Sequence, residues 1–130
     1  MSLKKDLETF LGDDKERRIA FLGIGSDIRG DEAAGLMIID HLKRKDLDEN
    51  ILLLNTGLRP ENFTGKVRDF KPTHVIMVDA AHFDGEPGEG RLIPTQEIGN
   101  EVYAHNTPLT LLKAYLEKTM CSNVALLGVQ

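Results

Sequence analysis

The chain has 130 residues, of which 41% are hydrophobic and 28% charged, and this composition is typical of one compact globular domain. Sixteen basic and twenty-one acidic residues give a net charge of -5, and tryptophan is absent, so the composition argues against nonspecific nucleic-acid binding. No apolar run approaches the roughly 20 residues of a membrane helix. The single cysteine, Cys121, excludes an internal disulfide framework and a cysteine-based zinc site, so we expect a cytoplasmic protein. From the charge and the short apolar runs we expect neither nucleic-acid nor membrane partners.

The first half of the chain predicts a helix, followed by a strand, a second helix and a second strand. Residues 3–11 predict a short polar helix. The apolar run 19–22 predicts a buried strand that ends at Gly23-Ile24-Gly25. Residues 31–44 predict a helix, because apolar side chains recur on one face and acids precede bases, as the helix dipole favours. The apolar run 51–54 predicts the second buried strand.

The second half of the chain continues the alternation. Pro60 opens a predicted helix over 60–70, and the apolar run 75–78 predicts a third buried strand with Asp79 directly after it. A short run, 91–94, ends in a proline, which indicates a strand end or a sheet edge. The last predicted elements are a helix over 108–119 and a buried strand over 124–127.

This order of elements predicts a three-layer α/β domain over 18–130 with a largely parallel sheet, and residues 1–17 form a helical extension ahead of it. In such domains functional residues collect where the carboxyl ends of the strands meet the loops that follow. Three segments meet at this rim of the sheet: 23–32, 55–59 and 79–85. The loop 100–107 precedes a helix and could fold over the same rim.

Two carboxylates and one imidazole are the candidate metal ligands of this rim: Glu32, Asp79 and His105. Such a set suits a borderline divalent cation, zinc or nickel, with an open coordination position. A carboxylate directly after a buried strand is costly unless it is paired or binds a metal. Structural alternatives remain open: Glu32 as an acid at a helix N-terminus, Asp79 as a cap of the next turn, and His105 as a solvated side chain. His82 is the other histidine on the rim.

The glycine-rich segment 23–35 does not complete a nucleotide-binding motif. Ile28 occupies the place of the third glycine in G-x-G-x-x-G, and the chain contains no G-x-x-x-x-G-K-[ST] phosphate loop. The glycines still suit a strand-to-helix turn, where the backbone needs room. A nucleotide-binding domain is therefore a weak alternative.

The segment 23–35 resembles the motif G-x-G-N-x-x-x-G-D-[DE]-G-x-G of the hydrogenase maturation endopeptidases, which process the large subunit of [NiFe] hydrogenases. The resemblance covers about residues 18–130 and continues through five further segments: Pro60-Glu61-Asn62, Val78-Asp79-Ala80, Pro87-Gly88-Glu89, His105-Asn106-Thr107-Pro108-Leu109 and Leu127-Gly128-Val129-Gln130. The P-E-N, P-G-E and H-N-x-P-L segments are most similar to the branch that serves formate-hydrogenlyase-type and energy-converting hydrogenases.

The resemblance implies a fold, an activity and a set of site residues. The implied fold is a twisted, mostly parallel five-stranded sheet with helices on both faces. The implied activity is that of a nickel-dependent, aspartyl-type endopeptidase, which removes the C-terminal extension of the large-subunit precursor after nickel insertion. Carried over by position, the metal-contacting residues of the family fall on Glu32, Asp79 and His105. In this scheme the precursor's cysteines already hold the nickel, which signals that the precursor is ready.

The chain departs from the family pattern in several places. Ser26 replaces the usual asparagine, and Ala33 stands where glycine is usual. Asn55 replaces an aspartate that is common at the end of the second strand, and an amide cannot exchange a proton at neutral pH. This departure motivates an alternative function, a noncatalytic module that senses nickel or binds the precursor. The chain also ends at Gln130, without the closing helix of the family, and an uncovered apolar sheet would favour homo-oligomers.

Overall fold

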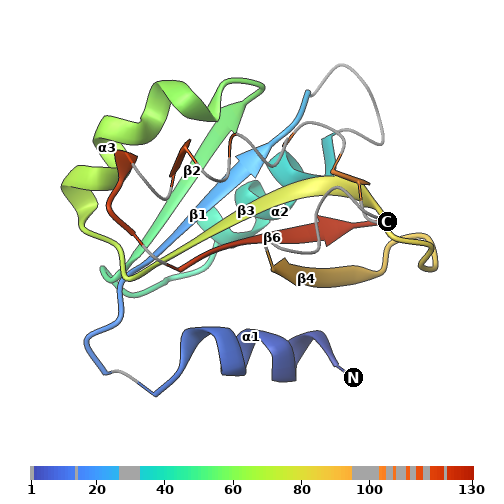
Figure 1. The fold of residues 1–130 in the computed structure, drawn as a ribbon, viewed down its shortest axis with the longest axis horizontal. Helices are drawn as coiled ribbons and strands as arrows, with labels where there is room; N and C mark the ends of the chain where they lie inside the picture. The colour runs from blue at the N-terminus through green and yellow to red at the C-terminus, as the bar shows by residue number, and fades with distance from the viewer. Residues whose placement is uncertain are drawn as a thin grey trace.

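The computed structural model describes residues 2–13, 15–26, 33–94, 103–104, 107, 111, 114–115, 118–121 and 123–130. Within these residues the strands form one sheet in the order β2-β1-β3-β6-β4, and a two-residue strand, β5, pairs with β3 off this path. The strands are β1 Ile19–Ile24, β2 Ile51–Gly57, β3 His74–His82, β4 Gly90–Pro94, β5 Tyr103–Ala104 and β6 Val124–Val129. The first four strands of the path are parallel, and β4 closes the edge antiparallel to β6, which confirms the mostly parallel five-stranded sheet (Figure 1).

Each predicted apolar run lies in a strand, but the strands are longer than the runs. The largest difference is in β3, which continues through Asp79 to His82. The prediction that Asp79 follows the strand is therefore wrong. The strand continues because its neighbours supply partners: Asp79 pairs with Gly128 of β6, and Ala81 pairs with Ala104 of β5. The run that ends in Pro94 is an edge strand, as predicted.

The helices also follow the sequence pattern closely. Helix α1 spans Leu3–Leu11, the range predicted, and α2 spans Ala34–Lys43. The predicted helix over 60–70 consists of two parts, a 3-10 turn η2 at Pro60–Phe63 and the α-helix α3 at Thr64–Phe70. Within the predicted helix 108–119, residues 111, 114–115 and 118 are helical, and most of the others lie outside the described residues. No helix in the described part of the chain is long and apolar enough to cross a membrane.

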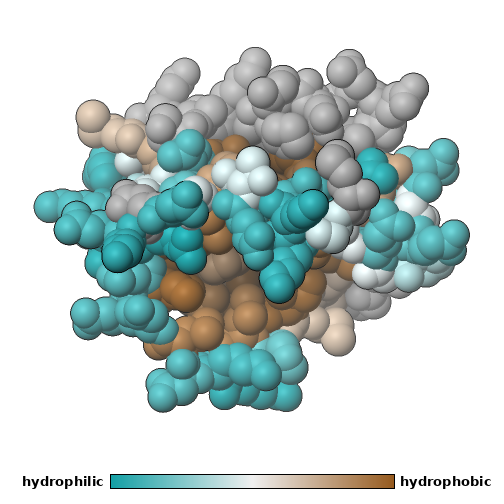
Figure 2. Space-filling model, turned by 90° about the horizontal axis from the view of Figure 1, so that it is seen from below, coloured by the Kyte–Doolittle hydropathy of each residue, from teal (hydrophilic) through white to brown (hydrophobic). Residues whose placement is uncertain are grey.

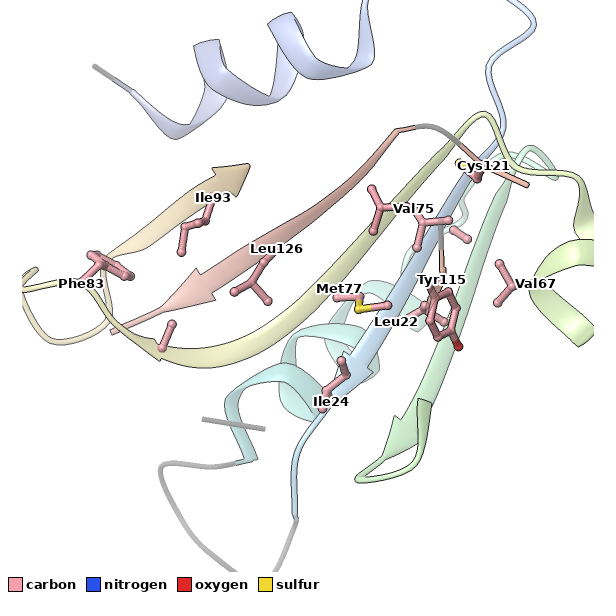
Figure 3. Packing of buried hydrophobic residues seen from close by; sticks show 13 residues of the cluster. Leu22, Ile24, Val67, Val75, Met77, Phe83, Ile93, Tyr115, Cys121 and Leu126 are labelled. Atoms are coloured by element: carbon pink, nitrogen blue, oxygen red, sulfur yellow. The ribbon is translucent and has the colours of Figure 1, made fainter. Parts of the chain in front are cut away.

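Helices lie on both faces of the sheet, which confirms the three layers. On one face α2 buries Ile39 against Ile76 and Val78 of β3. On the other face Leu22 and Met77 lie beside Tyr115, and Ile24 and Val67 of α3 belong to the same cluster (Figure 3). The sheet core is therefore covered from both sides.

Helix α1 shares the face of α2. Ser2 caps its first turn, and its Leu7, Phe10 and Leu11 pack against the cluster that α2 covers. None of its nine described residues is buried. Seen from below, apolar side chains gather into one area that hydrophilic side chains border (Figure 2). The half-buried apolar residues of this face are Leu7, Phe10, Leu11, Phe21, Ile38, Leu42, Leu53 and Leu127.

Candidate functional site

The carboxyl ends of the parallel strands form the rim that the sequence analysis identified. Gly23 of β1 pairs with Asn55 of β2 on one side and with Val78 of β3 on the other, and Val78 pairs in turn with Leu127 of β6. Asp79 lies one residue beyond this row. The strand-end segments 23–26, 55–57 and 79–82 therefore meet at one edge of the sheet, as predicted.

Asp79 is the most deeply buried carboxylate among the described residues of the rim. Its exposed fraction is 0%, and it lies on the face of β3 that carries Val75 and Met77. The Thr107 hydroxyl donates a hydrogen bond of 2.8 Å to Asp79 Oδ2, and Thr107 is itself buried. A buried carboxylate needs donors of this kind, because desolvation of its charge is otherwise costly. The Thr107 hydroxyl supplies one such donor.

The segment that contains His105 is attached to β3 on both sides of that residue. Tyr103 and Ala104 pair antiparallel with His82 and Ala81, and Thr107 donates to Asp79. His105 itself lies outside the described residues. Neither β5 nor the role of Thr107 was predictable from the sequence, because a two-residue strand has no periodicity and a lone threonine does not indicate a partner 28 residues away.

Glu32, Gly30 and Asp31 also lie outside the described residues. The residues that follow Glu32 are packed tightly against the rim. A Cβ added at Gly35 would lie 2.2 Å from the Val78 carbonyl oxygen and 2.5 Å from that of Ile24. The first turn of α2 therefore contacts the ends of β1 and β3 directly, and only glycine allows this approach.

The three described histidines are not near the Asp79 side chain. His82 is exposed and, by strand alternation, faces the opposite side of β3. His74 is buried at the other end of β3, where it contacts Thr73 and the ring of Phe10. His41 is exposed on α2. Among the described residues no group of three or more His, Cys, Asp or Glu side chains could hold a metal ion, and two members of the predicted set are not described.

Asn55 uses its amide to join β2 to α2. Its Nδ2 donates a hydrogen bond of 2.7 Å to Asp40 Oδ1. Its buried Oδ1 has no hydrogen-bond partner within the described chain and lies against Gly23, where an added Cβ would approach it to 2.6 Å. By strand alternation the side chain faces α2, whereas Asp79 faces the opposite layer. Asn55 therefore has a structural partner and does not face Asp79.

The P-E-N segment is tied to the layer opposite α2. The Tyr115 hydroxyl donates a hydrogen bond to the Pro60 carbonyl, and both residues are buried. Burial raises the pKa of the Tyr115 hydroxyl, and the nearby charge of Glu61 raises it further. Tyr115 therefore remains a protonated donor at neutral pH. This contact was not predictable from the sequence, where Tyr115 has the pattern of an ordinary core residue of a helix.

Gln130 holds the acidic loop after β3. Its Oε1 accepts hydrogen bonds of 3.0 Å from the backbone amides of Phe83 and Gly85. Its backbone amide donates to the Glu89 carbonyl, and its own carbonyl accepts from Gly88. The acidic side chains of this loop point to solvent: Asp84, Glu86 and Glu89 are all exposed. This exposure is typical of a solvated surface loop.

Comparisons with known proteins agree on one family. A family model described as hydrogenase maturation protease matches residues 36–130. A relative from Methanocaldococcus jannaschii is 32% identical over 122 residues, which are 88% of this chain and 72% of the relative. The Hydrogenase 3 maturation protease of Escherichia coli is 30% identical over 111 residues, which are 84% of this chain and 70% of that protein.

Solved structures show the same similarity. The crystal structure of the [NiFe] hydrogenase maturation protease HycI from Thermococcus kodakarensis has a TM-score of 0.81 at 36% identity and covers 96% of this chain and 80% of its own. The solution structure of the Escherichia coli endopeptidase HycI has a TM-score of 0.71 at 28% identity and covers 87% of this chain and 72% of its own. Because the match to the Thermococcus structure covers 96% of this chain, most of the segment 1–17 must also have a counterpart in that structure.

Proposed function

Because the chain belongs to the hydrogenase maturation protease family, a family of peptidases, we propose that it removes the C-terminal extension of a [NiFe] hydrogenase large-subunit precursor after nickel insertion. The observation that carries this proposal is the buried carboxylate of Asp79 at the rim, held by Thr107. The segment that follows β1 contains Glu32, and the segment between Ala104 and Thr107 contains His105, the other two predicted ligands.

In this proposal nickel arrives as part of the substrate. Glu32, Asp79 and His105 offer two carboxylates and one imidazole, donors that suit nickel and complement the cysteines of the precursor. The bound nickel supplies a positive charge that marks the precursor as ready and can polarise a nearby carbonyl. The role of this chain's residues is to hold that ion and orient the adjoining peptide. Asn55 has no part in proton transfer, because an amide does not titrate at neutral pH.

The branch and the compartment are further parts of the proposal. The P-E-N, P-G-E and H-N-x-P-L segments support a precursor of the formate-hydrogenlyase or energy-converting type. We place the reaction in the cytoplasm, since the precursor is an assembly intermediate. The free, buried thiol of Cys121 is compatible with a reducing compartment.

The test compares cleavage of nickel-loaded precursor by wild type and by three variants, Glu32→Gln, Asp79→Asn and His105→Ala. Each variant is expected to slow cleavage by about 100-fold or more, because each removes one contact to the reacting centre. Glu49→Gln and His41→Ala are the matched controls, since both residues are exposed and lie away from the rim. Circular dichroism establishes that every variant is folded.

Wild-type rates in all three site variants would contradict the assignment of the site. A wild-type chain that binds loaded precursor without releasing any peptide would instead favour the noncatalytic nickel-sensing module. The mass of the precursor distinguishes these outcomes directly.

A further inference from the structure

The hydrogen bond between Thr107 and Asp79 joins two residues that are both removed from solvent. Their exposed fractions are 1% and 0%, and the oxygen atoms are 2.8 Å apart. The Thr107 hydroxyl is the donor of this bond and Asp79 Oδ2 is the acceptor. Hydrogen bonds to a carboxylate are among the stronger ones in proteins. Because both groups are buried, solvent is not available to replace this bond if it is lost.

This bond is also the second of two attachments between the same segment and the same strand. Ala104 pairs with Ala81 of β3, and three residues later Thr107 reaches Asp79 of β3. The two attachment points on β3 are two residues apart, a distance of about 7 Å along a strand. Residues 103–104 and Thr107 are thus each attached to β3, and His105 lies between them in the sequence.

We infer that Thr107 is a positioning residue of the proposed protease site: its hydroxyl orients the Asp79 carboxylate and fixes the 103–107 segment to β3. The expected effect of Thr107 on cleavage rests on the proposed function. Its expected effect on the segment rests on the hydrogen bond alone. Thr107 touches Asp79 and needs no contact with the substrate.

The chemistry predicts a sharp difference between two substitutions at this position. Thr107→Val keeps the branched shape and removes the hydroxyl, which leaves Asp79 Oδ2 without this donor. Thr107→Ser keeps the hydroxyl and removes a methyl group. If the hydroxyl positions the Asp79 carboxylate, Thr107→Ser keeps the cleavage activity that Thr107→Val loses. Thr119→Val is the matched control, because Thr119 is also buried but its hydroxyl donates to the Tyr115 carbonyl.

The experiment has two readouts on the full-length chain. Hydrogen exchange measured by mass spectrometry reports the attachment of residues 103–107 without any substrate. Cleavage of nickel-loaded precursor, followed over a range of precursor concentrations, separates kcat from KM. For Thr107→Val we expect exchange of the segment to rise and kcat to fall by about 10- to 100-fold, with little change in KM. Thr107→Ser and Thr119→Val remain close to wild type in both readouts.

Three results would overturn the inference. Thr107→Val could match wild type in exchange or in kcat, Thr107→Ser could be as impaired as Thr107→Val, or the loss could lie in KM alone. If Thr107→Val does not fold, Thr107→Ala replaces it, since the smaller side chain leaves room for a water beside Asp79. If wild type does not cleave the precursor, the proposed function fails, and the exchange comparison still decides whether Thr107 anchors the segment.

Discussion

Asn55 and Asp40 form an amide–carboxylate pair at the end of β2. This pair explains, at the scale of single residues, why an asparagine fits where the family commonly has an acid. A second carboxylate at position 55 would face Asp40 at hydrogen-bond distance, with its other oxygen buried against Gly23. Like charges so close repel each other, and the buried oxygen would be desolvated. The amide avoids both costs.

The variant Asn55→Asp is therefore expected to lose about 1–2 kcal/mol of unfolding free energy at neutral pH. The double variant Asn55→Asp with Asp40→Asn reverses the pair and should recover the part of this loss that comes from charge repulsion. Urea unfolding followed by circular dichroism measures both values. An unchanged stability in the single variant, or no recovery in the double variant, would contradict the pairing.

Cys121 and Tyr115 predict how stability depends on pH. Burial raises the pKa of the Cys121 thiol, so the folded state keeps its proton where the unfolded chain releases it. The stabilisation is complete below the unfolded thiol pKa of about 8.5 and is lost as the pH rises through the folded value, at no more than about 1.4 kcal/mol per pH unit. Tyr115 acts in the same direction above about pH 10, the usual value for tyrosine.

Urea unfolding between pH 7 and pH 10 tests this expectation. Wild type should lose stability above about pH 8.5, whereas Cys121→Ala should lose less over the same interval, because alanine does not titrate. Parallel curves for the two proteins would show that the thiol does not contribute.

Most elements were predictable because each one repeats a local pattern. The apolar runs lie in strands, and the segments with a period of 3.6 residues form helices. For α1 and α2 the observed bounds lie within a few residues of the predicted ones. What local pattern cannot show is a partner that is distant in sequence. Pairing with Gly128 and Ala104 extended β3 beyond its apolar run, and β5 exists only through that pairing. The 3-10 turn at Pro60–Phe63 likewise has a partner distant in sequence, since the Tyr115 hydroxyl donates to the Pro60 carbonyl.

The close contact between α2 and the sheet predicts that one methyl group added at Gly35 lowers the free energy of unfolding. Gly35→Ala would place a Cβ 2.2 Å from the Val78 carbonyl, so α2 must move away from the rim. We expect a loss of about 3 kcal/mol or more in unfolding free energy, at the upper end of overpacked sites. Gly65→Ala in α3 is the matched control, because a Cβ there meets no atom within 4 Å and alanine favours the helix by about 0.5–1 kcal/mol.

Thermal unfolding of the two alanine variants provides the measurement. A melting temperature below wild type for Gly35→Ala and equal or higher for Gly65→Ala is the expected pair of results. Equal melting temperatures for both variants would contradict the close approach of α2.

At the scale of the whole molecule, strand–helix alternation was enough to predict three layers and the rim at the carboxyl ends of the strands. The order of the strands was not predictable, because it depends on contacts between distant segments. Asp79 was identifiable because a carboxylate after an apolar run is unusual. The contacts that Thr107 makes with Asp79 and Gln130 makes with the loop after β3 were not identifiable, since hydroxyl and amide side chains are common on any surface. Glu32, Asp79 and His105 all stay predictions as site residues.

The central claim is that this chain cleaves a hydrogenase precursor only when nickel is in place. Its most direct test is the intact mass of the large-subunit precursor, nickel-loaded or nickel-free, before and after incubation with the wild-type chain. We predict that the loaded precursor loses one defined C-terminal peptide and that the nickel-free precursor keeps its mass. Unchanged mass of the loaded precursor in a demonstrated complex with the chain, or equal cleavage of both forms, would contradict the claim.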